Sequence, residues 1–145
     1  MEYLSDIISS FRKHADPTNA LFMKKYMKNN FVFLGVKTPF RKAVSKPFMQ
    51  KETLPDPEKL PELVHALWGL DEREFQYFAI QLLMKFNRQA PEHWIDLYEF
   101  CIVNKSWWDT VDGLAGWCTG SHFIRFPNLI AGYTNKWMDS GNMWL

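Results

Sequence analysis

The chain has 145 residues, of which 47% are hydrophobic and 17% aromatic, so it is long enough to bury one core of ordinary domain size. No stretch approaches the roughly 18 consecutive apolar residues that a membrane-spanning helix needs. Residues 1–6 also lack the basic region and apolar core of a secretion signal. We therefore expect a single domain, residues 1–145, that is cytoplasmic and does not bind a membrane.

The net charge of +1 hides an uneven distribution of charge along the chain. Residues 1–51 hold ten Lys and Arg against three Asp and Glu, a net charge of +7, whereas residues 52–145 hold seven against thirteen, a net charge of −6. A basic segment on a nearly neutral protein favours a local anionic partner, and nucleic acid is the first candidate. The alternative is a solvated charged surface that binds no partner.

The cysteines and histidines do not form a recognisable metal or redox motif. Cys101 and Cys118 lack CxxC spacing, so we expect two buried free thiols in a reducing compartment. The four histidines are not spaced as zinc ligands. The chain also lacks a Gly-rich phosphate loop and the GxSxG, HExxH and Rossmann patterns. The sequence therefore predicts neither a metal nor a cofactor.

Apolar residues recur at helical spacing along nearly the whole chain, which predicts an all-α fold of about eight helices in antiparallel pairs. The helices are expected over residues 4–11, from 17, from 38, up to about 70, over 72–86, from about 91, over 107–119 and up to about 137. The pairs begin near residues 2, 39, 71 and 106, and this irregular spacing is typical of HEAT or TPR repeats. We therefore predict a HEAT-like helical-repeat solenoid, an α-α superhelix, whose concave surface could bind a partner.

The basic first third of the chain contains one strand-like run, residues 31–34, which Gly35 ends. Since no partner strand is visible, we interpret this run as a buried connection between helices. Thr38 is then expected to cap a helix that opens at Pro39. The free N–H groups at this helix start, with Arg41 close behind, would suit a phosphate group.

The segment 106–112, Ser-Trp-Trp-Asp-Thr-Val-Asp, is the most distinctive stretch of the sequence. Ser106 is expected to be a helix N-cap, and Asp109 completes a capping-box pattern with it. Trp108 and Asp112 are four residues apart and so share one helix face. An aromatic face beside a carboxylate is suited to a flat cationic ligand. The alternative is that both tryptophans belong to the core and Asp112 is an ordinary solvated residue.

Several motifs together resemble the AlkD-like DNA alkylation repair family, the HEAT-like-repeat alkylpurine DNA glycosylases. They are Tyr-Met-Lys-Asn at 26–29, Phe-Leu-Gly-Val-Lys-Thr-Pro-Phe-Arg at 33–41, Glu-Arg-Glu-Phe-Gln at 72–76, Lys-Ser-Trp-Trp-Asp-Thr-Val-Asp at 105–112 and Asn-Met-Trp-Leu at 142–145. The similarity extends from end to end of the chain. The tryptophan-rich motif is its most specific part.

The resemblance implies a hydrolase that removes cationic N3- or N7-alkylated purines from double-stranded DNA of the bacterial nucleoid. It implies no metal and no base flipping, because in this family the damaged nucleotide stays stacked in the duplex. By position, Trp108 and Asp112 match the catalytic tryptophan and aspartate of the family. Tyr26 matches a tyrosine that lines the DNA cleft. We also expect Lys28, Lys37, Thr38, Arg41 and Trp107 to lie at the DNA or substrate site, and Trp107 to serve mainly in packing.

Family members are longer than this chain, and the missing part carries a further cleft tryptophan and a DNA-contacting arginine. Two other functions therefore stay open: a catalytically incomplete DNA-binding fragment and a helical-repeat scaffold for protein interactions. The chain stops where Met143, Trp144 and Leu145 look like the opening of another apolar helix. We expect an apolar edge there that favours self-association, or a short tail that packs back on the core.

Overall fold

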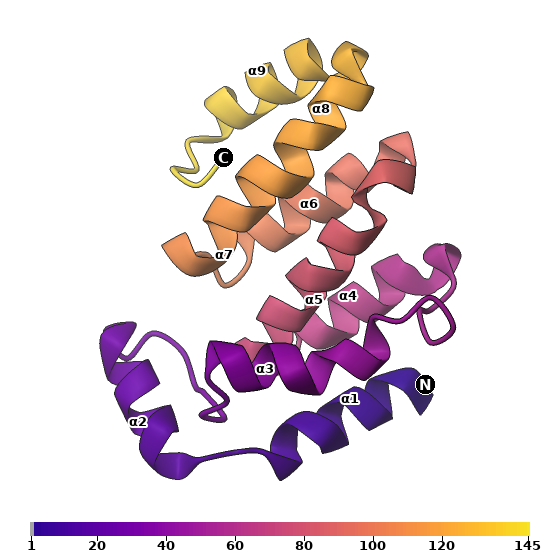
Figure 1. Ribbon diagram of the computed structural model, residues 1–145. Helices are drawn as coiled ribbons and strands as arrows, with labels where there is room; N and C mark the ends of the chain where they lie inside the picture. Colours follow the sequence, from indigo (N-terminus) through magenta and orange to yellow (C-terminus); the bar gives the residue numbers. More distant parts are fainter. Residues whose placement is uncertain (1) are drawn as a thin grey trace. The chain divides into compact units, whose positions relative to one another are not determined.

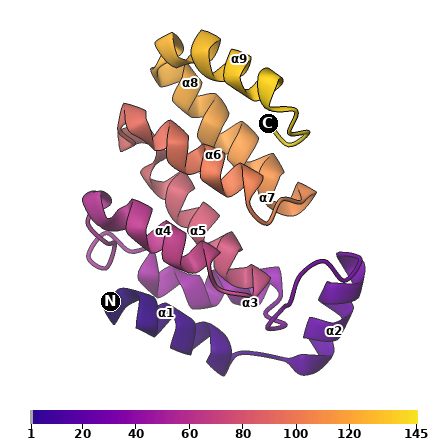
Figure 2. The ribbon, with the colours of Figure 1, turned by 180° about the vertical axis from the view of Figure 1, so that it is seen from behind.

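The computed structural model describes residues 2–145, and this part of the chain is helical throughout, with turns and loops between the helices. It contains no β-strand. The connection at 31–34 was expected to be buried, but only Phe33 is buried and Val32 is exposed, and its backbone makes an isolated bridge between Val32 and Glu72. The chain divides into two compact units, Met1–Ala79 and Ile80–Leu145, and the division falls inside one helix. Figures 1 and 2 show the ribbon from opposite sides.

The first unit consists of four helices and the first half of a fifth. They are α1 (Glu2–Lys13), α2 (Pro17–Tyr26), α3 (Thr38–Ser45), α4 (Leu60–Trp68) and α5 (Arg73–Phe86), with 3-10 turns at Lys46–Phe48 and Pro57–Lys59. Helices α1 and α3 lie side by side (Figure 1), and a short turn joins α4 to α5. Pro47 falls in the 3-10 turn directly after α3, as expected from its missing N–H group.

The core of the first unit is aromatic. Phe11 of α1 is fully buried and stacks on Phe75 of α5, with 5.6 Å between the ring centroids. It also meets Phe78 edge to face, again at 5.6 Å. These rings come from the apolar stripes that the helical spacing predicted for the two helices. Each such burial stabilises the fold by roughly 1.5–3 kcal/mol before the loss of conformational entropy is counted.

The two helix starts in the basic segment differ in how they are capped. Asp16 is the N-cap of α2, and its carboxylate accepts hydrogen bonds from the N–H groups of Thr18 and Asn19 at 3.0 and 3.1 Å. The predicted cap of α3 is wrong by one residue, since the N-cap is Lys37 and no side chain caps this helix. Lys37 has the extended backbone of an N-cap, so Thr38 is already the first helical residue. It therefore cannot be the N-cap of this helix.

The second unit contains the rest of α5 and four further helical segments. They are α6 (Ile95–Val103), α7 (Trp108–Gly113), α8 (Ser121–Arg125) and α9 (Ile130–Ser140), with 3-10 turns at Asn87–Gln89, Glu92–Trp94 and Pro127–Leu129. A π-helical segment, Leu114–Gly120, joins α7 to α8 without a break. When α7 and α8 are counted as one helix, residues 2–145 contain the eight helices predicted. Figure 2 shows α6 antiparallel to this long helix.

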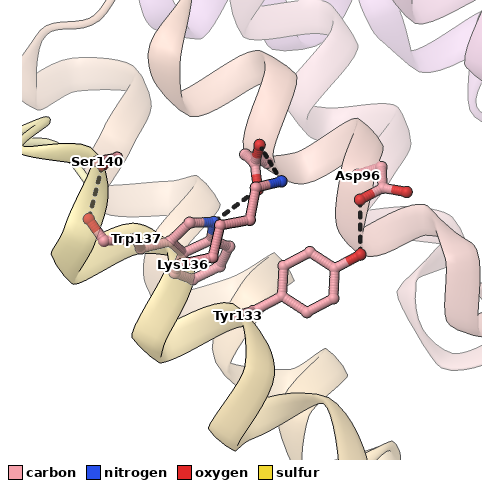
Figure 3. A network of polar contacts seen from close by, with 6 residues as sticks. Asp96, Tyr133, Lys136, Trp137 and Ser140 are labelled. Atoms are coloured by element: carbon pink, nitrogen blue, oxygen red, sulfur yellow. Dashed lines mark hydrogen bonds and ion pairs between the residues drawn. The ribbon is translucent and has the colours of Figure 1, made fainter.

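Helix α9 is fixed to α6 by polar contacts (Figure 3). The hydroxyl of Tyr133 donates to the carboxylate of Asp96 at 2.7 Å. The carboxylate of Glu99 accepts from the ammonium of Lys136 at 3.0 Å and from the indole N–H of Trp137 at 2.6 Å. Because Trp137 is also largely buried, these contacts anchor the C-terminal half of α9.

The free cysteines are buried as predicted. Burial raises the pKa of the Cys118 thiol to about 12 and also raises the pKa of the Cys101 thiol. Both thiols therefore stay protonated near neutral pH, so neither is an activated nucleophile. Within residues 2–145, no helix is long and apolar enough to cross a bilayer.

Candidate functional site

Helix α7 turns Trp108 and Asp112 toward solvent. Thr110, Val111 and Leu114 are buried on the other side of this helix, whereas the indole of Trp108 is 58% exposed and Asp112 is also exposed. The two exposed residues are four positions apart and therefore lie on one face of the helix. Trp108 is not a core residue, so the alternative in which both tryptophans only pack does not hold for it.

The start of α7 differs from the predicted capping box. Trp107, in extended backbone, is the N-cap, and its carbonyl accepts from the N–H groups of Thr110 and Val111 at 3.2 and 3.0 Å. Ser106 precedes the N-cap and so does not cap this helix, and its hydroxyl donates instead to the carbonyl of Ile102, at the end of α6. Ser106 lies between α6 and α7, so its hydroxyl could bond to the last turn of α6 or to the first turn of α7. It bonds to the last turn of α6.

The carboxylate of Asp112 is available to a ligand. Within residues 2–145 it makes no hydrogen bond and no ion pair. One turn further along, Gly116 is exposed, and a Cβ added there would meet no atom within 4 Å. This face of the helix therefore offers an unpaired negative charge, an aromatic surface and room for a bulky ligand to approach the backbone closely.

Trp108 and Trp107 are in contact with a third indole. Trp144 meets Trp108 edge to face, with ring centroids 4.9 Å apart and planes at 69°. It lies 6.3 Å from the ring of Trp107, which is half-buried. The sequence did not predict these contacts, because more than thirty positions separate the partners and no local spacing connects them.

In the first unit, Tyr26 and Lys28 end helix α2 on its exposed side. The side chain of Tyr26 is 88% exposed, and Lys28 is exposed as well. The N–H of Lys28 bonds to the carbonyl of Lys25 at 3.0 Å, and that of Asn29 to the carbonyl of Lys24 at 2.8 Å. This is a Schellman ending, in which Lys28 occupies with φ 55° the left-handed position usually held by glycine.

Lys37, Thr38 and Arg41 gather at the start of α3, also in the first unit. Lys37 and Thr38 are exposed, whereas the guanidinium of Arg41 is partly covered and lies 5.1 Å from the ring centroid of Tyr77. Burial lowers the pKa of Arg41, and Tyr77 and Glu74 oppose that effect. The N-terminus of α3 carries no side-chain cap, so no side chain bonds to the N–H groups of Thr38 and Phe40, where a phosphate could bind.

A buried carboxylate that the sequence analysis missed holds this loop in place. Glu74 is fully buried, and its carboxylate accepts from the N–H groups of Leu34, Gly35 and Val36 at 2.9, 2.9 and 3.0 Å. Three donors on one carboxylate fix the backbone that leads directly into Lys37. The available signal was an acidic residue inside an otherwise apolar helical stripe.

Gly35 is required at the same loop. Its φ is +95°, and a Cβ added there would lie 1.9 Å from the carbonyl oxygen of Asp16. The N–H of Asp16 in turn bonds to the carbonyl of Leu34 at 2.9 Å. The loop therefore touches the start of α2 through bare backbone, which only glycine allows.

The first unit also has a shallow depression of about 380 Å³ between α2 and residues 32–34. Its lining is apolar apart from Lys24, and it contains no acid and no nucleophile. Among residues 2–145, no group of three or more His, Cys, Asp and Glu side chains is placed to hold a metal ion. The exposed face of α7 is therefore the better candidate for chemistry.

Comparison with known proteins agrees with the motifs at these positions. The family model for DNA alkylation repair enzymes matches residues 7–145. A solved structure described as a predicted DNA alkylation repair enzyme from Enterococcus faecalis is 30% identical, with a TM-score of 0.76. The match covers 90% of this chain but 61% of that one, so this chain spans about three fifths of its length. No curated protein matches. The chain belongs to the DNA alkylation repair enzyme family.

Proposed function

We propose that this protein is a DNA glycosylase that hydrolyses the N-glycosidic bond of cationic N3- or N7-alkylated purines in duplex DNA of the nucleoid. One observation carries the proposal: Trp108 and Asp112 share the exposed face of α7, and the carboxylate has no partner within residues 2–145. Membership of the alkylation repair family supports the substrate class. The proposal needs no metal and no cofactor.

The chemistry follows from the charge of the substrate. An alkylated purine such as N7-methylguanine is already cationic, so the enzyme need not protonate it. As the bond between C1′ and the base nitrogen breaks, its electron pair leaves with the base, and the sugar becomes an oxocarbenium ion. The carboxylate of Asp112 stabilises that developing charge and orients the water whose oxygen bonds to C1′. The proton lost from the water passes to the carboxylate or to solvent.

Trp108 contributes through its electron-rich ring face. A cationic sugar or base within about 6 Å of an indole centroid is attracted by the ring quadrupole. Because the site lies on an open helix face, it can contact a nucleotide that stays stacked in the duplex. The proposed mechanism therefore does not flip the base into an enclosed pocket. Selectivity then arises largely because neutral, undamaged purines leave too slowly.

The exposed residues of the first unit are proposed to hold the duplex. Lys28 and Lys37 would contact phosphates, as would the free N–H groups at the Thr38 end of α3. Tyr26 and Arg41 would also contact the DNA. These contacts position the substrate, whereas the reaction itself belongs to α7. Trp107 is proposed to support the site from beneath through its contact with Trp144.

A second candidate function is duplex binding without catalysis. One observation favours it: the chain spans 61% of the related structure, so the DNA contacts of the rest of such a protein are not among those of residues 2–145. Salt-sensitive binding to duplex DNA without base release would identify this function.

The experiment that tests the proposal compares Asp112→Asn with the parent protein. We expect single-turnover release of N7-methylguanine from duplex DNA to fall by about 10²–10³-fold, because the amide removes the charge but keeps the shape. Asp139→Asn, an exposed aspartate on α9, is the matched control and should release base at the parent rate. Release by Asp112→Asn at the parent rate would show that the carboxylate does not act in the reaction.

A further inference from the structure

The edge-to-face contact between Trp144 and Trp108 gives the proposed site a component outside α7. Trp108 is the first residue of its helix and more than half exposed, so little else limits its side chain. An exposed indole can adopt several staggered rotamers. A second ring at 4.9 Å with planes at 69° has the T-shaped geometry that aromatic pairs prefer, and it selects one of these rotamers.

Trp144 is itself held by a series of hydrogen bonds. The backbone N–H of Trp144 donates to the side-chain oxygen of Asn142 at 2.9 Å, and the backbone N–H of Asn142 donates to the hydroxyl of Ser140 at 3.1 Å. The hydroxyl of Ser140 donates to the carbonyl of Trp137 at 2.6 Å. Gly141, with φ +70°, provides the left-handed turn that ends α9.

This series ends on a fixed part of the second unit. The indole N–H of Trp137 donates to the carboxylate of Glu99 on α6 at 2.6 Å (Figure 3). The backbone of Trp144 is therefore connected through short contacts to a buried tryptophan and to α6. A residue whose backbone is held in this way can present its side chain as a support for another one.

We propose that Trp144 is a positioning residue, which holds the indole of Trp108 in the orientation that contacts the cationic nucleotide. This inference rests on the proposed function, because it names what keeps the aromatic surface of that site in place. It assigns no chemistry to Trp144. Removing its ring should leave the reaction intact but lower the fraction of molecules in which Trp108 is correctly placed.

The test uses the full chain labelled with 5-fluorotryptophan, with the Trp108 resonance assigned by its loss in Trp108→Phe. Trp144→Ala should broaden or split the Trp108 resonance, because the indole then exchanges between rotamers, and Trp144→Phe should restore a single sharp resonance. Met143→Ala is the matched control, since Met143 lies in the same turn with its side chain 76% exposed. It should leave the Trp108 resonance unchanged.

Base release is then measured on the same variants. We expect Trp144→Ala to release N7-methylguanine about tenfold more slowly at saturating protein, and Trp144→Phe to recover most of that loss. A single Trp108 resonance as sharp as that of the parent in folded Trp144→Ala would overturn the inference, as would parent-rate release by that variant. If the parent releases no base while the Trp108 resonance still broadens in Trp144→Ala, the positioning stands and the proposed function fails.

Discussion

Lys28 adopts a backbone conformation that is costly for a lysine. A non-glycine residue in the left-handed region loses roughly 1–2 kcal/mol relative to glycine. Lys28 has φ 55° at the Schellman position of α2, where glycine is the usual residue. Strain retained at an exposed position is consistent with a functional lysine.

Lys28→Gly should therefore raise the free energy of unfolding by about 1 kcal/mol and weaken binding to duplex DNA. Chemical denaturation and a duplex titration measure the two effects. Asn29→Gly is the control, because Asn29 has φ 61° but carries no charge, so it should leave DNA binding unchanged. A Lys28→Gly protein that binds DNA as tightly as the parent would remove Lys28 from the proposed interface.

His122 predicts a dependence of stability on pH. It is fully buried; Nε2 lies 2.9 Å from the carbonyl of Glu92, and Nδ1 has no partner. Burial lowers the pKa of His122 below 6.5; the charges of Arg125 and His93 lower it further, and the carbonyl and carboxylate of Glu92 oppose this. The unfolded chain therefore takes up the proton more readily than the folded one.

The free energy of unfolding should then fall as pH decreases through about 6.5 and level off below the pKa of the folded state. Denaturation midpoints measured between pH 5 and pH 8 test this, with His122→Gln as the variant that should flatten the dependence. The exposed His14 provides the control, since His14→Gln should leave the slope as in the parent. A slope unaffected by His122→Gln would contradict the assignment.

At the scale of single elements, Glu74 shows how α5 supports the loop before α3. Glu74→Gln keeps the shape of the side chain but replaces one acceptor oxygen with an N–H₂ group that faces backbone N–H donors. An unsatisfied buried donor costs about 1–3 kcal/mol. We expect the free energy of unfolding to fall by about that amount and DNA binding to weaken with it.

The adjacent Glu72 gives a matched control. Its carboxylate lies 3.6 Å from the guanidinium of Arg12, whose side chain is 54% exposed. Glu72→Gln should therefore change the free energy of unfolding by less than about 1 kcal/mol. If the two substitutions lower the free energy of unfolding equally in urea denaturation, the three hydrogen bonds of Glu74 contribute no more to stability than the ion pair of Glu72.

The elements themselves could be predicted to very different degrees. Helical spacing identified α1 and α5, because in each the apolar stripe faces a core. The start of α2 was predicted at Pro17, although no residue of α2 is buried. Helix α6 begins at Ile95, after a 3-10 turn, and not near residue 91 as expected. The same reasoning ended the Trp108 helix near residue 119, whereas the helical backbone continues to Arg125 through the π-helical segment. A period of 3.6 residues cannot represent a π turn, and the glycines in this stretch look like a helix end.

At the scale of the whole molecule, the sequence predicted the all-α class and the family, and both are confirmed. It placed Trp108 and Asp112 on one helix face because that relation is local. It could not predict Glu74 beneath residues 34–36 or Trp144 beside Trp108, because contacts between distant positions leave no periodic signal. Self-association stays a prediction, supported by the exposed Ile124 of α8 and Met138 of α9.

Hydrolysis of the glycosidic bond can be identified from the product that the protein forms on duplex DNA carrying a single N7-methylguanine. We expect free 7-methylguanine in solution and an abasic site in the strand, in equal amounts. Guanine left in an intact strand after loss of the methyl group would contradict hydrolysis of the glycosidic bond. Unchanged DNA bound to folded protein would contradict catalysis and favour duplex binding alone.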